Sequence, residues 1–490
     1  QGLKELFMSE QLVFVGNNKR GQPRYSTKKM ILLEKNMLKS AQQRANETTH
    51  LVSLKLVNLE IKKFEASKKV TLTGEQREMI IDLTTRPGGI KIALGIAGSG
   101  KSYALEVAKN IWERSKSRVY GMAPTGKAAI GLETSTRINA VTIDRFLLLN
   151  SPKTLKRQIF VVDEAGMIGS IKLSKLLELA KSNDAKVVLV GDLGQLQPVE
   201  AGAAARLIED KLGSVKLNEI YRQKIDWQKK ATQYFSEGEG LKALLEYKKN
   251  DQLGVYSSPQ MAHKALVEDY MSDLKAAPSD TRLVITETNF QSNILNNHIR
   301  DELRRTNKLG PEYIIDVKKG SDEPLERRGF SVNDRIVFTK NDKNIGITNG
   351  VFGEIVQIKR QLRGIELKVK TDIGNLVSFN TKDYKHIENG YAVTVYKAQG
   401  DTIDKTFFLL SEKTSREATY VAMSRHKKTS KMYIDRQNFS DLIDWDRVNN
   451  FNENSDKIGE IESKTILCTS KKLNALHKKD TSLDYGSQQI

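Results

Sequence analysis

The segment from Gly95 to Ser102 reads GIAGSGKS and matches the pattern G-x-x-x-x-G-K-[S/T] of a phosphate-binding loop. A mostly apolar run at residues 90–94 predicts a buried strand before it, and apolar side chains at helical spacing over residues 103–112 predict a helix after it. Backbone N–H groups at the start of that helix can cradle phosphates, whose negative charge the helix dipole favours. A chance glycine-rich turn is the alternative, but both flanking elements favour an α/β fold built around a nucleotide site.

The loop pattern also assigns chemistry to its side chains. We expect Lys101 to reach the β- and γ-phosphates of ATP and the Ser102 hydroxyl to bind Mg²⁺. The other loop residues expected to contact the nucleotide are Gly95, Gly98, Ser99 and Gly100.

The apolar runs extend the α/β pattern through residues 71–217. Runs that predict buried strands lie at 91–94, 119–123, 159–162 and 186–190, with helical patterns between them. This alternation predicts a parallel sheet with right-handed crossovers, in which ligands bind beyond the carboxyl ends of the strands.

The pattern changes after residue 217. Residues 218–310 are mostly helical around a strand at 282–286, and strands at 406–410 and 431–434 return the chain to α/β order. Between them, short runs separated by Asn-Gly and Gly turns predict a small antiparallel barrel. Its strands are expected at 335–338, 351–358, 365–370 and 376–379.

The net charge favours a polyanionic partner. The 490 residues include 79 Lys and Arg against 60 Asp and Glu, a formal net charge of +19. Such a surplus points to nucleic acid, although it could serve solubility alone. Residues 1–70 are basic and α-rich, and their surface could bind DNA or only be solvated. The elements expected there are an apolar run at 12–15, a turn at 16–18, a helix capped by Ser26 or Thr27, and helical structure that continues over 51–64.

Other features narrow the class of protein. No run approaches the roughly 18 apolar residues of a membrane span, and no signal peptide is visible, so we expect a soluble cytoplasmic protein. The single Cys468 excludes an internal disulfide and a multi-cysteine metal site. Since the first residue is Gln1, we expect a piece of a longer protein. The histidines lie singly, without ligand spacing, and predict neither zinc nor a nicking site; they are His50, His263, His298, His386, His426 and His477.

Acidic and amide side chains follow two of the predicted strands. An ATPase with a phosphate loop needs an acid for Mg²⁺ and a base that orients the attacking water. We assign these roles to Asp163 and Glu164, which end the strand at 159–162; a helix-capping acid pair is the alternative. Gln195 follows the strand at 186–190, where its amide could bind a γ-phosphate or the attacking water.

With these motifs in this order, the chain resembles superfamily 1 helicases of the RecD-like group and, more narrowly, the helicase part of TraA-type conjugative relaxases. The likeness runs from about Tyr25 to Ile434. Besides the loop and the acid pair, it rests on segments 72–76, 123–129, 191–195, 217–223, 390–400 and 420–425.

The resemblance implies roles for single residues. Gln76 would recognise adenine, Gln195 would sense hydrolysis, and Gly400 would contact the nucleotide. Arg222 and Arg425 would act as arginine fingers, each worth roughly 10³–10⁵ in turnover. For an isolated arginine, a surface ion pair is the alternative.

The resemblance also implies contacts with single-stranded DNA. Pro124, Thr125, Lys127 and Thr394 match positions that touch the DNA backbone. Many relatives carry His where this chain has Tyr396, which favours base stacking or packing over a polar coupling role. Core packing is the alternative for Tyr396 and for the nearby tyrosine at 391.

The implied fold is α/β, with two RecA-like P-loop domains with parallel sheets, an inserted small SH3-like β-barrel and an α-rich N-terminal extension. The expected segments are the extension at 1–70, the first RecA-like domain at 71–217, the second at 218–327 and 385–447, the barrel at 328–384, and a polar, disordered tail at 448–490.

The implied function is that of an ATP-dependent DNA helicase or translocase with ATP and Mg²⁺, moving 5′→3′ on single-stranded DNA and acting at duplex junctions. It would be the motor portion of a conjugative transfer protein, with the conjugative transfer machinery as partner. The alternatives are a RecD-like helicase of repair or recombination, and a DNA-binding scaffold that binds nucleotide without turnover.

Overall fold

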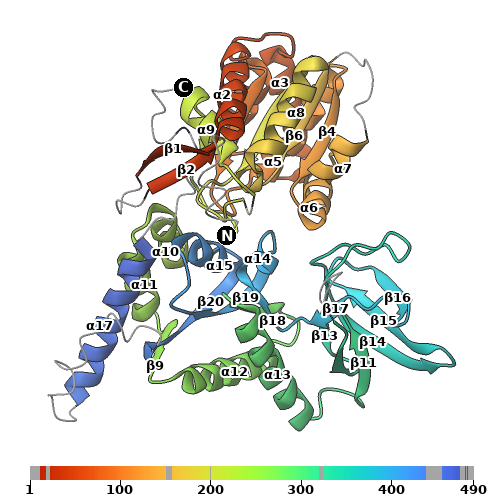
Figure 1. Cartoon of the computed structure of the whole chain (residues 1–490), viewed down its shortest axis with the longest axis vertical. Coiled ribbons are helices and arrows are strands. Elements are labelled where there is room, and N and C mark those ends of the chain that lie inside the picture. The colour runs from red at the N-terminus through yellow and green to blue at the C-terminus, as the bar shows by residue number, and fades with distance from the viewer. Residues whose placement is uncertain are drawn as a thin grey trace. The chain divides into compact units, whose positions relative to one another are not determined.

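The computed structural model describes residues 12–17, 23–149, 157–198, 200–318, 324–437, 455–474, 481 and 483. The chain divides into two compact units, residues 1–221 with 478–490 and residues 222–477. Figure 1 shows the elements of both. The expected turn residue Asn18 and part of the expected polar tail lie outside the described residues.

The first unit is built on a six-stranded parallel sheet. Every residue of its two central strands β6 and β7 is buried, as expected for a sheet covered on both faces. Four strands were predicted; the two edge strands of three residues are too short to leave a pattern. In sheet order the strands are β5 (Ala140–Thr142), β4 (Arg118–Ala123), β6 (Gln158–Val162), β7 (Ala185–Gly191), β3 (Ile90–Gly95) and β8 (Val215–Leu217).

Helices bury their apolar faces against both sides of this sheet. One core contains residues of α2 (Lys28–Gln43), α7 (Ile143–Leu148), α8 (Ser170–Ser182) and α9 (Ala204–Leu212). The core on the other face contains residues of α3 (Leu54–Lys68), α4 (Gly74–Thr85), α5 (Lys101–Arg114) and α6 (Gly126–Thr136).

The N-terminal residues do not form a separate body. Their described part begins with an antiparallel hairpin of β1 (Leu12–Asn17) and β2 (Pro23–Thr27). Of the two predicted caps it is Thr27 whose hydroxyl accepts from the Met30 amide, at 3.1 Å. Helices α2 and α3 then join the two cores of the first unit, because their apolar faces complete the cover of the sheet. The extension expected at 1–70 is therefore part of the first unit.

The second unit has a five-stranded parallel sheet with α12 (Pro259–Ala276) and α13 (Asn289–Arg305) packed on one face. The predicted strand at 282–286 is confirmed as β10. In sheet order the strands are β18 (Ala392–Thr394), β10 (Arg282–Thr286), β19 (Ile403–Leu410), β20 (His426–Asp435) and β9 (Leu253–Tyr256). The unit's other helices include α10 (Asp226–Glu237), α11 (Gly240–Lys249), α14 (Val395–Ala398) and α15 (Arg416–Met423).

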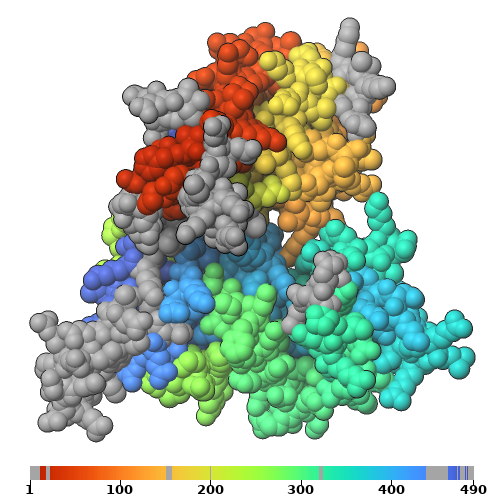
Figure 2. Space-filling model, viewed as in Figure 1, coloured from red at the N-terminus to blue at the C-terminus, as the bar shows by residue number. Residues whose placement is uncertain are grey.

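An antiparallel insert lies between α13 and β18, and it begins before the predicted boundary at 328. Its hairpin, β11 (Tyr313–Val317) and β12 (Glu326–Phe330), shares one apolar core with a five-stranded sheet. Together they form the barrel of this unit, which is cyan in the surface view of Figure 2. In sheet order the five strands are β16 (Leu376–Asn380), β15 (Gly364–Thr371), β14 (Phe352–Gln361), β13 (Arg335–Phe338) and β17 (Ile387–Asn389).

The polar tail expected at 448–490 contains a helix, α17 (Ser455–Asn474). This helix packs on α11, where Lys248 and Glu462 form an ion pair at 2.5 Å and the Gly240 amide donates to Asn474 Oδ1 at 2.7 Å. Ile466 and Leu473 are buried one heptad apart. Buried Thr and Ser residues make up much of the same face, which is why the apolar pattern was too weak to predict the helix.

Candidate active site

The phosphate loop joins β3 to α5 and depends on its glycines. Gly98 and Gly100 have φ angles of 82° and 83°, in the left-handed region that favours glycine. A Cβ on Gly95 would lie 2.6 Å from Ser99 Oγ, closer than side-chain atoms approach. The tight path of the loop therefore needs glycine at these positions.

Lys101 and Asp163 lie close enough for their charges to interact. Lys101 Nζ donates to the carbonyl of Gly95 and, at 3.3 Å, to that of Ile96. Burial raises the pKa of Asp163 above its ordinary value, and the positive charge of Lys101 opposes that rise. Because β7 lies between β6 and β3, the carboxyl ends of all three strands meet at one edge of the sheet.

The second acidic residue has an unusual backbone conformation. Glu164 has a φ of 49°, uncommon outside glycine, and its amide donates to Asp163 Oδ1 at 2.9 Å. A Cβ on Gly191, which ends β7, would lie 3.2 Å from the Ala165 amide nitrogen. The acid-pair loop and the loop after β7 are therefore in close contact.

Two amides lie at the same edge. Gln195 is 4% exposed, and its Nε2 donates to Asp192 Oδ2 at 3.0 Å. Gln76 forms a capping box with Thr73 at the start of α4, and its Nε2 reaches the Ser99 carbonyl at 3.4 Å. The structure thus brings Gln76, Lys101, Asp163 and Gln195 to one edge of the first sheet.

The chemistry of this edge fits ATP and Mg²⁺. Ser99 Oγ is buried with no hydrogen-bond partner, and a phosphate oxygen would satisfy it. Among the residues that the structure describes, no three His, Cys, Asp or Glu side chains could hold a metal by themselves. Ser102 and Asp163, together with phosphate oxygens, would make a ligand set typical of nucleotide-bound Mg²⁺.

The segment after β8 connects the loop to the second unit. The Ile96 amide donates to the Leu217 carbonyl at 3.1 Å, and the Tyr221 amide donates to the Gly98 carbonyl at 2.8 Å. Arg222, the next residue, belongs to the second unit.

Arg222 and Arg425 lie together in the second unit. Arg222 Nη1 donates to the Ser424 carbonyl at 2.8 Å, and Arg425 Nη2 donates to Ser424 Oγ at 2.9 Å. Arg425 is only 2% exposed, and its Nε donates to the Val421 carbonyl at 2.9 Å. The sequence places these arginines in separate motifs. In the fold, both side chains donate hydrogen bonds to the same residue, Ser424.

His426 is buried close to this arginine pair, a placement that the sequence did not predict. Burial, followed by the charge of Arg222, lowers its pKa to about 3, so the imidazole is neutral. Its Nε2 lies 3.1 Å from Gln223 Nε2 and 3.0 Å from Gln228 Oε1. The only sign of this placement in the sequence was that His426 directly follows Arg425.

The DNA candidates of the first unit lie where β4 meets α6. Thr125 is exposed and caps α6, its hydroxyl accepting from the Ala128 amide at 3.2 Å. Its hydroxyl proton can still donate to a phosphate, beside the positive end of the helix dipole. Pro124 and Lys127, on either side, are partly buried.

The candidates of the second unit lie around α14. Thr394 ends β18 and is 8% exposed, whereas Tyr396 is 52% exposed. Tyr391 is a core residue: it is 3% exposed, and its hydroxyl donates to Asp334 Oδ1 at 2.8 Å. Gly400 has a φ of 85° and open space around its missing Cβ.

Family models match both units. A model described as an AAA domain matches residues 71–258, and one described as a viral superfamily 1 RNA helicase core domain matches residues 318–434.

Curated relatives match most of the chain. The conjugal transfer protein TraA of Agrobacterium fabrum is 32% identical over 420 residues, which are 85% of this chain and 37% of that protein. The ATP-dependent RecD2 DNA helicase of Deinococcus radiodurans is 26% identical over 366 residues, 68% of this chain and 45% of that protein. The chain spans less than half the length of either relative.

Solved structures share the fold. A Bacteroides Pif1 helicase, crystallised with ADP-AlF3 and single-stranded DNA, matches 78% of this chain and 98% of its own with a TM-score of 0.50 and 20% identity. Pif1 helicase of Candida albicans matches 80% of this chain and 98% of its own with a TM-score of 0.51 and 16% identity. The solved structures confirm the predicted fold. The resemblance is also confirmed: the chain contains superfamily 1 helicase domains and has TraA conjugal transfer proteins and RecD-like helicases among its homologues.

Proposed function

We propose that this chain is an ATP-dependent DNA helicase, the motor portion of a conjugal DNA transfer protein. The observation that carries the proposal is the gathering of Lys101, Asp163 and Gln195 at one edge of a parallel sheet whose strand β3 leads into a phosphate loop. Nucleotide-driven motors use such an edge to bind and hydrolyse ATP.

Each polar residue of the edge has a part in this proposal. ATP with Mg²⁺ would supply the phosphoryl group whose hydrolysis drives movement. Lys101 and the loop amides hold its phosphates, Ser102 and Asp163 hold the metal, and Glu164 orients the attacking water. Gln195, fixed by Asp192, reports the state of the γ-phosphate to the loop after β7. Gln76 and Gly400 contact the rest of the nucleotide.

The arginine pair completes the proposal. Phosphoryl transfer needs positive charge on several sides of the γ-phosphate, and arginine fingers supply it. Arg222 and Arg425 share Ser424, so a movement of the second unit would carry both. Coupling between that movement and hydrolysis would step the motor along DNA.

We propose single-stranded DNA and its duplex junctions as the substrate. Pro124, Thr125 and Lys127 would contact the backbone through the first unit, and Thr394 and the exposed Tyr396 through the second. A tyrosine that stacks on a base contributes about 1–3 kcal/mol without selecting a sequence. The net charge of +19 supports a polyanionic partner.

The conjugal role is favoured over a RecD-like role in repair. Identity to the Agrobacterium TraA is 32% over 85% of the chain, against 26% over 68% for the Deinococcus RecD2 helicase. The conjugative transfer machinery would then be a partner.

Within the described residues, no helix is long and apolar enough to cross a membrane.

Strand displacement tests the motor and its direction together. The substrates are duplexes with a 5′ or a 3′ single-stranded overhang, and Glu164→Gln is the control that retains the binding surfaces. We expect ATP-dependent displacement on the 5′ overhang by the unchanged chain alone. Binding of DNA and ATP without displacement or hydrolysis would favour the scaffold alternative.

A further inference from the structure

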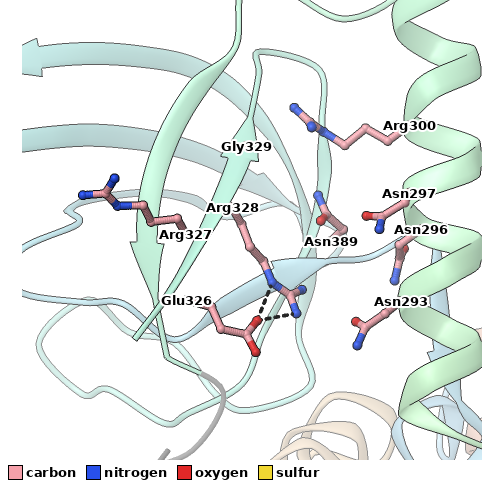
Figure 3. A pocket seen from close by; sticks show the side chains of 9 residues that line it. All are labelled: Asn293, Asn296, Asn297, Arg300, Glu326, Arg327, Arg328, Gly329 and Asn389. Carbon is pink, nitrogen blue, oxygen red and sulfur yellow. Dashed lines mark hydrogen bonds and ion pairs between the residues drawn. The ribbon is translucent and has the colours of Figure 1, made fainter. Parts of the chain in front are cut away.

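A polar pocket lies in the second unit between α13 and the β11–β12 hairpin, as Figure 3 shows. Its volume is about 520 Å³, far above the ~30 Å³ that one water occupies in the liquid. Asn293, Asn297 and Arg300 share one side of α13 because they are four and then three residues apart. In Figure 3 these side chains point from the helix toward the hairpin.

Three arginines line the pocket, Arg300, Arg327 and Arg328, and the first and last of them differ in how many of their N–H donors are already used. Arg300 Nε donates to both carboxylate oxygens of Asp334, at 3.0 and 3.1 Å, and its Nη1 donates to Glu312 at 2.6 Å. These carboxylates hold the Arg300 side chain in place at one side of the pocket. Arg328 donates from Nε and Nη2 to a single oxygen of Glu326, at 3.1 and 2.9 Å. A guanidinium has five N–H donors, so Arg328 retains capacity for a further acceptor.

Asn389, which ends β17, gives an independent sign of a ligand. Its side chain lines the pocket and is 5% exposed, and its Nδ2 is buried with no hydrogen-bond partner. Buried amide donors are nearly always paired, so a guest that presents acceptors would satisfy this one.

We propose that the pocket binds one phosphodiester group of single-stranded DNA, an inference that rests on the proposed function. Amides and guanidiniums donate hydrogen bonds, and phosphate oxygens accept them. The pocket also adjoins the strand that carries Thr394: Asn296 Nδ2, on the same helix, donates to the Ala392 carbonyl of β18 at 2.8 Å. A phosphate contact there holds the strand in register without reading its bases.

An isosteric change of charge tests the proposal. Asn297 is exposed, so Asn297→Asp places an anion at the pocket without disturbing the core. Binding of a labelled oligothymidylate is measured over a series of salt concentrations. We expect Asn297→Asp to weaken binding by about tenfold or more, and Arg328→Ala to reduce the slope of log affinity against log salt by about 0.7, the value for one phosphate contact. Asn307→Asp, an exposed position just beyond the same helix, is the matched control and is expected to bind within about twofold of the unchanged chain.

The outcomes separate failure of the pocket from failure of the proposed function. Unchanged affinity and slope in both pocket variants, while the unchanged chain binds DNA, would overturn the pocket and leave the motor standing. Failure of the unchanged chain to bind DNA would overturn the proposed function and the pocket with it. If the pocket variants weaken binding of free thymidine monophosphate and leave the oligothymidylate unaffected, the pocket takes a free nucleotide and the proposal is wrong.

Discussion

Arg222 Nη1 donates to the main-chain carbonyl of Ser424, 202 residues further along the chain, at 2.8 Å. The side chain of the same serine accepts from Arg425 at 2.9 Å. One residue at the end of α15 thus positions both arginines that the sequence motifs single out. Neutral, buried His426 adds no competing charge beside them.

Loss of either arginine is expected to lower the rate of ATP hydrolysis strongly and the affinity for nucleotide only slightly. In Arg222→Ala and Arg425→Ala, kcat for ATP should fall by about 10³-fold or more, since that is the lower range for an arginine finger. Nucleotide affinity, measured by fluorescence titration, should change far less. Arg305→Ala removes an arginine whose side chain is 73% exposed and is the control. A near-normal kcat in both variants would show that these residues do not act as arginine fingers.

The sequence predicted most of what lies at the first sheet's edge, for a physical reason. Strands β3, β6 and β7 are buried on both faces, so they leave long apolar runs, and their functional residues follow directly at the carboxyl ends. The positions of Gln195 and Asp163 at this edge therefore follow from the amino-acid pattern alone.

Other features depend on contacts between distant residues and leave no local pattern. Tyr391 could not be assigned to the core from its flanks, because it packs among distant elements and its hydroxyl donates to Asp334, 57 residues away. Strands β5 and β8 have three residues each, and they are recognisable as strands only because they pair with the longer strands β4 and β3. Helix α17 carries its buried face on threonines and serines as much as on apolar residues.

The contact between barrel and sheet is expected to be a major stabilising element of the second unit. Asp334 is fully buried and joins Arg300 to Tyr391. Asp334→Ala leaves a buried guanidinium poorly compensated and should lower the free energy of unfolding by about 3 kcal/mol. Asp316→Ala, which breaks an exposed pair with Arg327, should cost about 0.5 kcal/mol or less. Equal effects in chemical denaturation would contradict this account.

Glu287 makes stability depend on pH. Burial raises its pKa to about 7, and its Oε2 has no hydrogen-bond partner. Because the folded state binds this proton more tightly than the unfolded state does, the contribution of Glu287 to stability is lost as pH rises from about 4.5 to about 7. Glu287→Gln should therefore raise the unfolding midpoint at pH 8, and the gain should vanish near pH 4.5. A gain of equal size at both pH values would show that titration of Glu287 is not its cause.

Hydrolysis of ATP with and without single-stranded DNA tests the central claim most directly. The samples are the unchanged chain, Lys101→Ala and Glu164→Gln, each checked for an unchanged unfolding midpoint. We predict that DNA stimulates hydrolysis in the unchanged chain, and that both variants lose this activity while Glu164→Gln still binds nucleotide. Hydrolysis that does not respond to single-stranded DNA in a folded sample, or that persists in both variants, would contradict the account.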